Sequence, residues 1–205
     1  MTYRRKDAYY RRARAAGYRA RSAYKLAEID ARFRLLHPGD RVLDLGAWPG
    51  GWLQVALERV GPEGRVVGVD IVPIEPLDAA NVALVTGDVR ERATLDAAVV
   101  RLGGRADILL SDLAPKLSGV RATDEARAAE LLDAMLDALP IVLRRGGRLL
   151  AKVFMDPGYD AMIDRLRTCF ATIRTTRPEA TRRGSAELYV VGLNHECVGK
   201  PSERR

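Results

Sequence analysis

Six charged side chains lie beside short apolar runs in this chain of 205 residues, where they could together form one site. Four acids end or follow four such runs, a lysine lies near the end of a fifth, and a glutamate begins the last: Asp44, Asp70, Asp88, Asp112, Lys152 and Glu187. If the runs are parallel strands, their carboxyl ends share one edge, where open α/β sheets bind ligands. Glu187 joins that edge if the last strand is antiparallel. One such residue is more often a helix cap or turn former, but the set predicts a binding or catalytic site.

The turn after the first run, residues 44–52 (DLGAWPGGW), indicates what would bind there. It is not G-x-G-x-x-G, and the chain has no G-x-x-x-x-G-K-[ST], so the dinucleotide fingerprint and the P-loop fit poorly. Its glycines still allow a ligand to approach the backbone closely. Asp70, 24 residues after Gly46, is placed to accept hydrogen bonds from a ribose diol. Asp88 could accept one from an adenine amino group. These features favour an adenosine pocket without a pyrophosphate cradle, because a tight turn alone would explain the glycines but not the acids.

Alternating strands and helices would position these side chains. The patterns predict strands at 41–45, 65–70, 82–86, 106–112, 148–154, 172–176 and 186–193, and helices at 22–33, 51–60, 93–102, 122–143 and 159–170. This order is typical of a parallel sheet covered on both faces. No apolar run approaches the roughly 18 residues of a membrane span. Cys169 and Cys197 lack metal-site or disulfide-framework spacing, which favours a reducing compartment.

The net charge of +7 is concentrated at the start of the chain. Residues 1–25 hold nine Lys or Arg and one acid, a net of +8, and they hold five of the seven tyrosines. Arginine and lysine neutralise phosphates and tyrosine rings stack on bases, so this stretch is interpreted as a nucleic-acid arm. A solvated basic helix and an organelle transit peptide are the alternatives. The remaining 180 residues are nearly neutral and, with 47% apolar residues in the whole chain, suit a single domain.

Seven motifs between about Ala20 and Leu193 resemble those of a known family. They are SAYKLAEID (22–30), DLGAWPGGW (44–52), VGVDIVP (67–73), GDVR (87–90), SDLAP (111–115), AKVF (151–154) and SAELY (185–189). In this order they resemble the FtsJ-type ribosomal RNA 2′-O-methyltransferases. The resemblance implies an α/β fold, a Rossmann-like seven-stranded sheet of the S-adenosylmethionine-dependent methyltransferases with helices on both faces. S-adenosyl-L-methionine is the implied cofactor.

The resemblance also implies roles for individual residues. The family's Lys-Asp-Lys-Glu tetrad falls on Lys25, Asp112, Lys152 and Glu187. Its cofactor contacts fall on Gly50, Trp52, Asp70, Asp88 and Asp112. Trp48 departs from the small residue usual in this loop, which affects the expected pocket shape but not the chemistry. Because the basic stretch ends at Lys25, cleavage of a transit peptide there would remove part of the implied active site.

The chemistry of 2′-O-methylation suits these side chains. A ribose hydroxyl is a weak nucleophile and must lose its proton, and Lys152 as a neutral amine is the expected base. A free lysine has a pKa near ~10.4, which must fall for this role. The Lys25 cation and the sulfonium would lower it, while Asp112 and Glu187 would orient the lysines. Positioning the two reactants should supply much of the rate, and no metal is needed.

The expected partner is ribosomal RNA in the large subunit, since compact bacterial members modify one uridine of the 23S A loop in the assembled subunit. We expect residues 1–21 to be a basic RNA-binding arm, 22–196 the methyltransferase domain and 197–205 a flexible tail. Arg11, Arg12, Arg14 and Arg19 would contact the RNA. A cytoplasmic monomer is expected, with no membrane or metal partner. The alternatives are methylation of transfer RNA or a messenger cap, a non-catalytic ribosome-assembly factor, and a nucleotide-dependent oxidoreductase.

Overall fold

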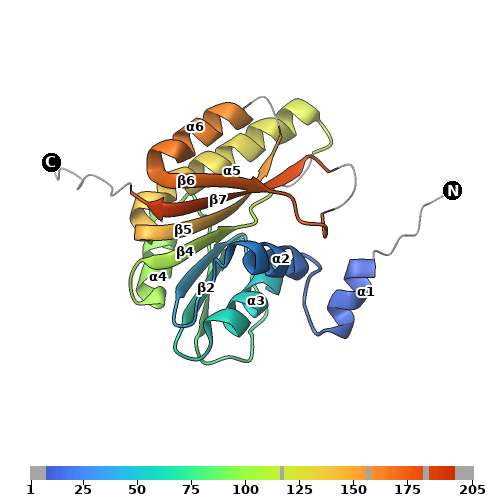
Figure 1. Cartoon of the computed structure of the whole chain (residues 1–205), viewed down its shortest axis with the longest axis vertical. Helices are drawn as coiled ribbons and strands as arrows, with labels where there is room; N and C mark the ends of the chain where they lie inside the picture. The colour runs from blue at the N-terminus through green and yellow to red at the C-terminus, as the bar shows by residue number, and fades with distance from the viewer. Residues whose placement is uncertain (1–7, 116–117, 156–157, 182–184, 197–205) are drawn as a thin grey trace.

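A single sheet forms the centre of the molecule (Figure 1). The computed structural model describes residues 8–115, 118–155, 158–181 and 185–196, so the tail predicted at 197–205 lies outside it. Within the described residues seven strands are present: β1 (Arg41–Leu45), β2 (Arg65–Asp70), β3 (Val82–Thr86), β4 (Ala106–Ser111), β5 (Leu143–Phe154), β6 (Phe170–Thr176) and β7 (Glu187–His195). They are ordered β3-β2-β1-β4-β5-β7-β6.

The strand directions bring the predicted site residues to one edge. β1 to β5 run parallel, whereas β7 is antiparallel to both β5 and β6. The condition set for Glu187 is therefore met, since the antiparallel direction of β7 pairs Glu187 with Phe154 at the end of β5. β1 lies between β2 and β4, so the chain order reverses there. In open α/β sheets the ligand crevice opens at such a switch point.

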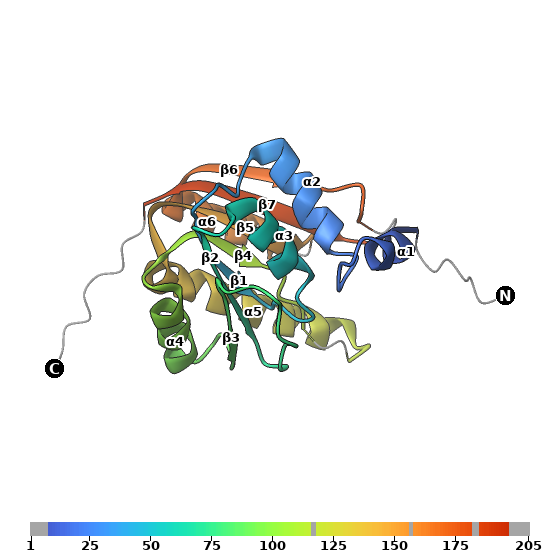
Figure 2. The ribbon, with the colours of Figure 1, turned by 90° about the horizontal axis from the view of Figure 1, so that it is seen from below.

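Helices cover both faces of this sheet (Figures 1 and 2). On one face lie α2 (Ala23–Phe33) and α3 (Gly51–Val60), and on the other α4 (Arg92–Leu102), α5 (Arg121–Val142) and α6 (Tyr159–Cys169). α1 (Ala8–Ala15) contacts α2 at the side of the molecule (Figure 2). The predicted α/β fold with two covered faces is confirmed. No helix in the described ranges is long and apolar enough to cross a membrane.

Alternating strand residues separate the two apolar cores. On β1, Leu43 and Leu45 belong to the cluster beneath α4, α5 and α6, whereas Val42 belongs to the cluster beneath α2 and α3. The side-chain period of two in a strand produces this division. It places Asp44, one position on from Leu43, on the same face as Val42, toward α2 and α3.

The predicted and observed bounds differ most at β5. It begins at Leu143 rather than at 148, because Leu143 pairs with Ala106 before a register shift lets Arg148 pair with Ile108. The intervening sequence RRGG resembles a turn, so strand periodicity did not include it. The bounds of β1, β2, β3 and α3 match the prediction, since each is a short apolar pattern ended by glycine, proline or aspartate.

Candidate active site

Lys152 and Asp112 form the centre of the site at the ends of neighbouring strands. The Lys152 Nζ donates to Asp112 Oδ1 and to the Asp112 main-chain oxygen, each at 2.8 Å. The Lys152 side chain is only 8% exposed, and that of Asp112 is 22% exposed. Two contacts to one residue fix the amine at the carboxyl edge of the sheet, as the tetrad prediction requires.

Lys25 and Glu187 form a second pair beside the first. Lys25, buried on α2, makes an ion pair and hydrogen bond to Glu187 Oε1 at the start of β7. Burial raises the pKa of Glu187, but the hydrogen bond and charge of Lys25 outweigh it, together with the Tyr189 hydroxyl, and hold that pKa below its usual value. Glu187 is thus a carboxylate at neutral pH. Residues 162 positions apart in the chain meet here.

Tyr189 joins the two pairs and was not assigned a role from the sequence. Its hydroxyl donates to Glu187 Oε1 at 2.8 Å and lies 3.4 Å from both Asp112 Oδ1 and the Lys25 Nζ. Burial, followed by the charges of Asp112 and Glu187, raises the pKa of this fully buried hydroxyl, so it stays a donor. The sequence held a signal for Tyr189, since it follows Glu187 by two positions and residues two apart on a strand face the same side.

The acids predicted to bind adenosine lie on the neighbouring strands. Asp70 accepts backbone hydrogen bonds from Trp48 and Val72, each at 2.9 Å, and so lies between the turn after β1 and the segment after β2. Asp88 after β3 is paired with the Arg90 guanidinium, whose hydrogen bonds lower the pKa of Asp88. Both carboxylates occupy the predicted edge.

Asp44 differs from the other acids predicted at this edge. It is 0% exposed, and in the described part of the chain neither of its carboxylate oxygens has a hydrogen-bond partner. Burial, then the charges of Asp112 and Asp70, raise the pKa of Asp44 well above its usual value. An unpartnered buried acid beside two further carboxylates suits a cationic ligand, and S-adenosylmethionine carries a sulfonium and an ammonium. These residues therefore fit the implied cofactor.

The remaining predicted cofactor residues lie at the start of α3. Gly50 has φ 108°, a left-handed conformation that glycine adopts readily, and it is the N-cap residue just before α3. The Trp52 side chain is 3% exposed and its Nε1 donates to the Ser22 oxygen at 2.9 Å. The indole is thus part of the core, so a cofactor contact at Trp52 would use its backbone N–H in the first turn of α3.

The predicted RNA-binding arginines divide into two groups. Arg11, Arg12 and Arg14 are exposed on α1, and the Arg12 guanidinium lies 5.0 Å from the Tyr24 ring centroid. Arg19 instead donates hydrogen bonds to main-chain carbonyls within the protein. Sequence reasoning missed this internal role, because charge alone does not distinguish an arginine that binds phosphate from one that binds carbonyls.

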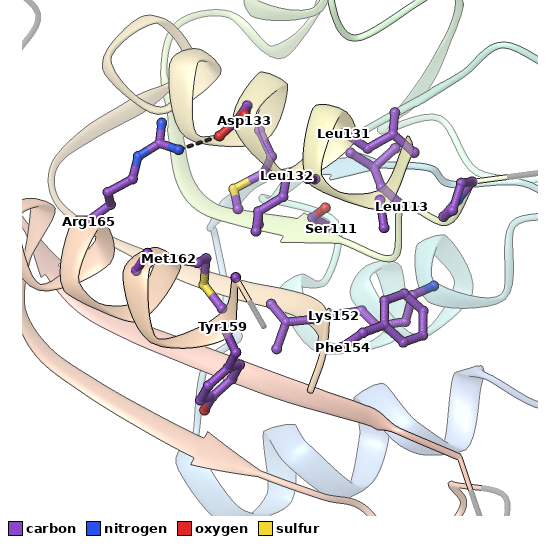
Figure 3. A pocket seen from close by; sticks show the side chains of 17 residues that line it. Ser111, Leu113, Leu131, Leu132, Asp133, Lys152, Phe154, Tyr159, Met162 and Arg165 are labelled. Carbon is purple, nitrogen blue, oxygen red and sulfur yellow. Dashed lines mark hydrogen bonds and ion pairs between the residues drawn. The ribbon is translucent and has the colours of Figure 1, made fainter. Parts of the chain in front are cut away.

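A cavity of about 140 Å³ adjoins Lys152 on the α5 and α6 side (Figure 3). Its walls are mainly apolar and come from three places, α5, α6 and the end of β5: Leu131, Leu132, Tyr159, Met162 and Phe154. Ser111 lies between them, and an ion pair between Arg165 and Asp133 lies at one side (Figure 3). A small apolar recess thus opens beside the base expected for catalysis.

Comparison with known proteins shows the family of this chain. The model of the FtsJ-like methyltransferase family matches residues 18–195. The chain belongs to this family. A Ribosomal RNA large subunit methyltransferase E of Methanothermobacter thermautotrophicus is 46% identical over 92% of this chain and 90% of its own length. The predicted cofactor, S-adenosylmethionine, and the predicted enzyme class are confirmed with the family.

Two solved structures have a fold similar to that of this chain. A ribosomal RNA methyltransferase from Plasmodium falciparum superposes with a TM-score of 0.74 at 27% identity, covering 87% of this chain and 98% of that one. The fibrillarin of Aeropyrum pernix, solved with natively bound S-adenosyl-L-methionine, shares the fold with a TM-score of 0.57 at 18% identity over 78% of this chain and 68% of its own. Among the residues that the structure describes, no group of three His, Cys, Asp or Glu could hold a metal ion.

Proposed function

We propose that this FtsJ-like methyltransferase transfers a methyl group to the ribose 2′-hydroxyl of a uridine in the A loop of large-subunit ribosomal RNA. The observation that carries the proposal is the pair of buried lysines, Lys152 and Lys25, each held by its own carboxylate at one sheet edge. The ribosomal substrate is supported by the names of relatives that match over nine-tenths of this chain.

The chain's own residues supply the proton transfer. Lys152 in its neutral form accepts the 2′-hydroxyl proton on Nζ while the oxygen attacks. Asp112 holds that amine at two points, and Glu187 holds Lys25 beside it. Bound S-adenosylmethionine supplies an electrophilic methyl group. Asp70 and Asp88 would hold its ribose and adenine, and Asp44 would face its positive charge.

The RNA would be held by the basic arm and by the recess beside Lys152. Arg11, Arg12 and Arg14 present exposed charge on α1, which suits phosphates, and α1 packs against the helix that carries Lys25. The apolar walls around Tyr159 and Phe154 would receive the target base once it is turned out of its stack. We propose that the enzyme acts as a monomer in the cytoplasm, where ribosomal subunits assemble.

The deciding experiment maps 2′-O-methyl groups on ribosomal RNA. Large subunits that lack the A-loop methyl group are incubated with the protein and tritiated S-adenosylmethionine, and free ribosomal RNA, transfer RNA and capped RNA are tested in parallel. We expect one new methyl group on one A-loop uridine. Methylation of transfer RNA or caps alone would overturn the substrate. Cofactor binding without any methyl transfer would favour a non-catalytic assembly factor.

A further inference from the structure

The segment before α2 packs against α3, the helix at whose start the predicted cofactor residues lie. Gln54 of α3 donates to the Gly17 oxygen at 2.9 Å and accepts from the Arg19 backbone N–H at 2.8 Å. Tyr18 donates to Glu58 at 2.9 Å, also on α3. Residues 17–19, which the sequence analysis included in the arm, are therefore part of the packed domain, in agreement with a family match that begins at residue 18.

The Arg19 side chain extends from this segment over two loops at the cofactor edge. Its Nη1 donates to the Glu75 oxygen at 2.5 Å and lies 3.4 Å from the Pro49 oxygen. Its Nη2 donates to the Pro76 oxygen at 2.6 Å. One planar guanidinium thus joins the turn after β1 to the segment after β2. Lysine could not reproduce this, since its donors radiate from a single nitrogen.

The close fit of Arg19 depends on the glycine beneath it. A Cβ atom at Gly50 would lie 3.2 Å from both Cδ and Nη1 of Arg19. The arginine stem therefore rests on the backbone of Gly50, the N-cap residue of α3. The site uses this glycine twice, for its left-handed backbone and for the space that Arg19 fills.

The same two loops hold Asp70 in place. Trp48 and Val72, which donate their backbone N–H groups to the Asp70 carboxylate, come from the turn after β1 and the segment after β2. The separation of these loops thus sets the position of a cofactor-binding acid. Asp70 links the loops at the strand end, and Arg19 links them further along, at Pro49 and at Glu75 and Pro76.

We infer that Arg19 is a positioning residue for the cofactor site. It holds the two loops at the spacing that receives S-adenosylmethionine, so that little ordering remains when the cofactor binds. It acts through main-chain carbonyls and through Asp70. It therefore serves cofactor affinity rather than the proton transfer at Lys152.

The test compares Arg19→Met with Arg14→Met. Arg14 is exposed on α1, and its substitution removes one positive charge from the same end of the chain as Arg19→Met does. Calorimetry gives the Kd for S-adenosylmethionine without RNA, and amide hydrogen exchange follows residues 46–51 and 71–77. We expect Arg19→Met to raise the Kd about tenfold and to speed exchange in both loops, with kcat at saturating cofactor within about twofold. Arg14→Met should leave the Kd and the exchange as in the wild type.

A second variant keeps the test decisive if Arg19→Met does not fold. Arg19→Lys retains the charge and the stem on Gly50 but loses the fork, and it should raise the Kd by a smaller factor in the same direction. An unchanged Kd in a folded Arg19 variant would overturn the inference, as would a lower kcat at unchanged Kd. A lower melting temperature alone, with wild-type Kd and exchange, would show a purely structural role and also overturn it. Because cofactor binding is measured without RNA, failure of the proposed RNA substrate would leave these results interpretable.

Discussion

The catalytic half and the cofactor half of the site differ in how their charged side chains are partnered. In the catalytic half each lysine has a carboxylate partner, Lys152 with Asp112 and Lys25 with Glu187, and Tyr189 bridges the two pairs. In the cofactor half Asp44 is buried and has no hydrogen-bond partner among the residues that the structure describes, whereas Asp88 is held by an exposed arginine. Catalytic side chains that are already oriented lose little freedom in the reaction. An acid left unpaired instead raises the free energy of the empty protein, and a cationic ligand can recover that energy.

The largest expected effect comes from breaking the catalytic half at Lys152. Lys152→Met keeps much of the side-chain volume but removes the base, so methyl transfer should fall by at least ~100-fold. The Kd for S-adenosylmethionine should stay near that of the wild type, because the cofactor acids are untouched. A tritium transfer assay and calorimetry measure the two quantities. Arg101→Met, an exposed change on α4, is the control. Activity close to wild type would remove Lys152 from the role of base.

The cofactor half is tested by Asp44→Asn, which removes the ionisable group at nearly constant shape. The pKa of Asp44 is raised in the folded protein, so its carboxyl keeps its proton at pH values where the unfolded chain, above about pH 4, has released it. The free energy of unfolding therefore falls as pH rises through this range. The variant should lose that dependence and gain melting temperature over the wild type as pH rises toward 8. Its affinity for the cofactor should fall about tenfold.

Asp107→Asn is the matched control for Asp44→Asn. Asp107 lies near the start of β4, at the far end of the sheet, where Arg41 and Arg144 pair with it. Burial raises the pKa of Asp107, but its hydrogen bonds from Arg41 and Arg144 hold it below its usual value. Its loss should lower the melting temperature at pH 7 and leave cofactor affinity unchanged. Tighter or equal cofactor binding by Asp44→Asn would contradict the view that Asp44 contributes to binding the positive charge of the cofactor.

In the catalytic half a smaller effect is expected at Glu187, which positions Lys25. Glu187→Gln should lower kcat about tenfold, less than Lys152→Met, because Tyr189 still contacts Lys25. The depressed pKa of Glu187 means that its stabilisation is fully present above the unfolded pKa of about 4.3 and is lost as pH falls through the folded value. The variant should thus be less stable than wild type at pH 7 by about 1–3 kcal/mol, and equal to it in strong acid.

Urea unfolding at several pH values measures this difference. Glu63→Gln is a suitable control, since Glu63 is exposed in the turn before β2. A stability difference for Glu187→Gln that persists unchanged below pH 3 would show that packing, not the ion pair, joins β7 to α2.

The elements predicted well share a local cause. The bounds of β1, β2, β3 and α3 follow from apolar patterns that end at turn residues within the same short stretch of sequence. β5 and α1 were predicted less well. The start of β5 depends on pairing between Leu143 and Ala106. The helix at Ala8–Ala15 lies in a stretch that was interpreted from its charge as a nucleic-acid arm, without a predicted helix.

The candidate site divides in the same way. Family motifs placed Lys25, Asp112, Lys152 and Glu187 in the tetrad, and the structure brings these four together. Trp52 was expected to contact the cofactor, but its side chain is part of the core against Tyr189, at 5.9 Å between ring centroids. A motif names a position and does not state whether the side chain or the backbone serves the ligand.

By itself the sequence determined the alternation of strands and helices, the edge to which the charged residues belong, and the basic character of the first 25 residues. Only the tertiary structure decided that Asp44 is buried with no hydrogen-bond partner in the described part of the chain, that Tyr189 bridges the lysine pairs, and that Arg19 faces carbonyls. The reason is the range of the interactions. Periodicity and turn chemistry act between near neighbours, whereas Lys25 and Glu187, 162 positions apart, meet only when the sheet is complete.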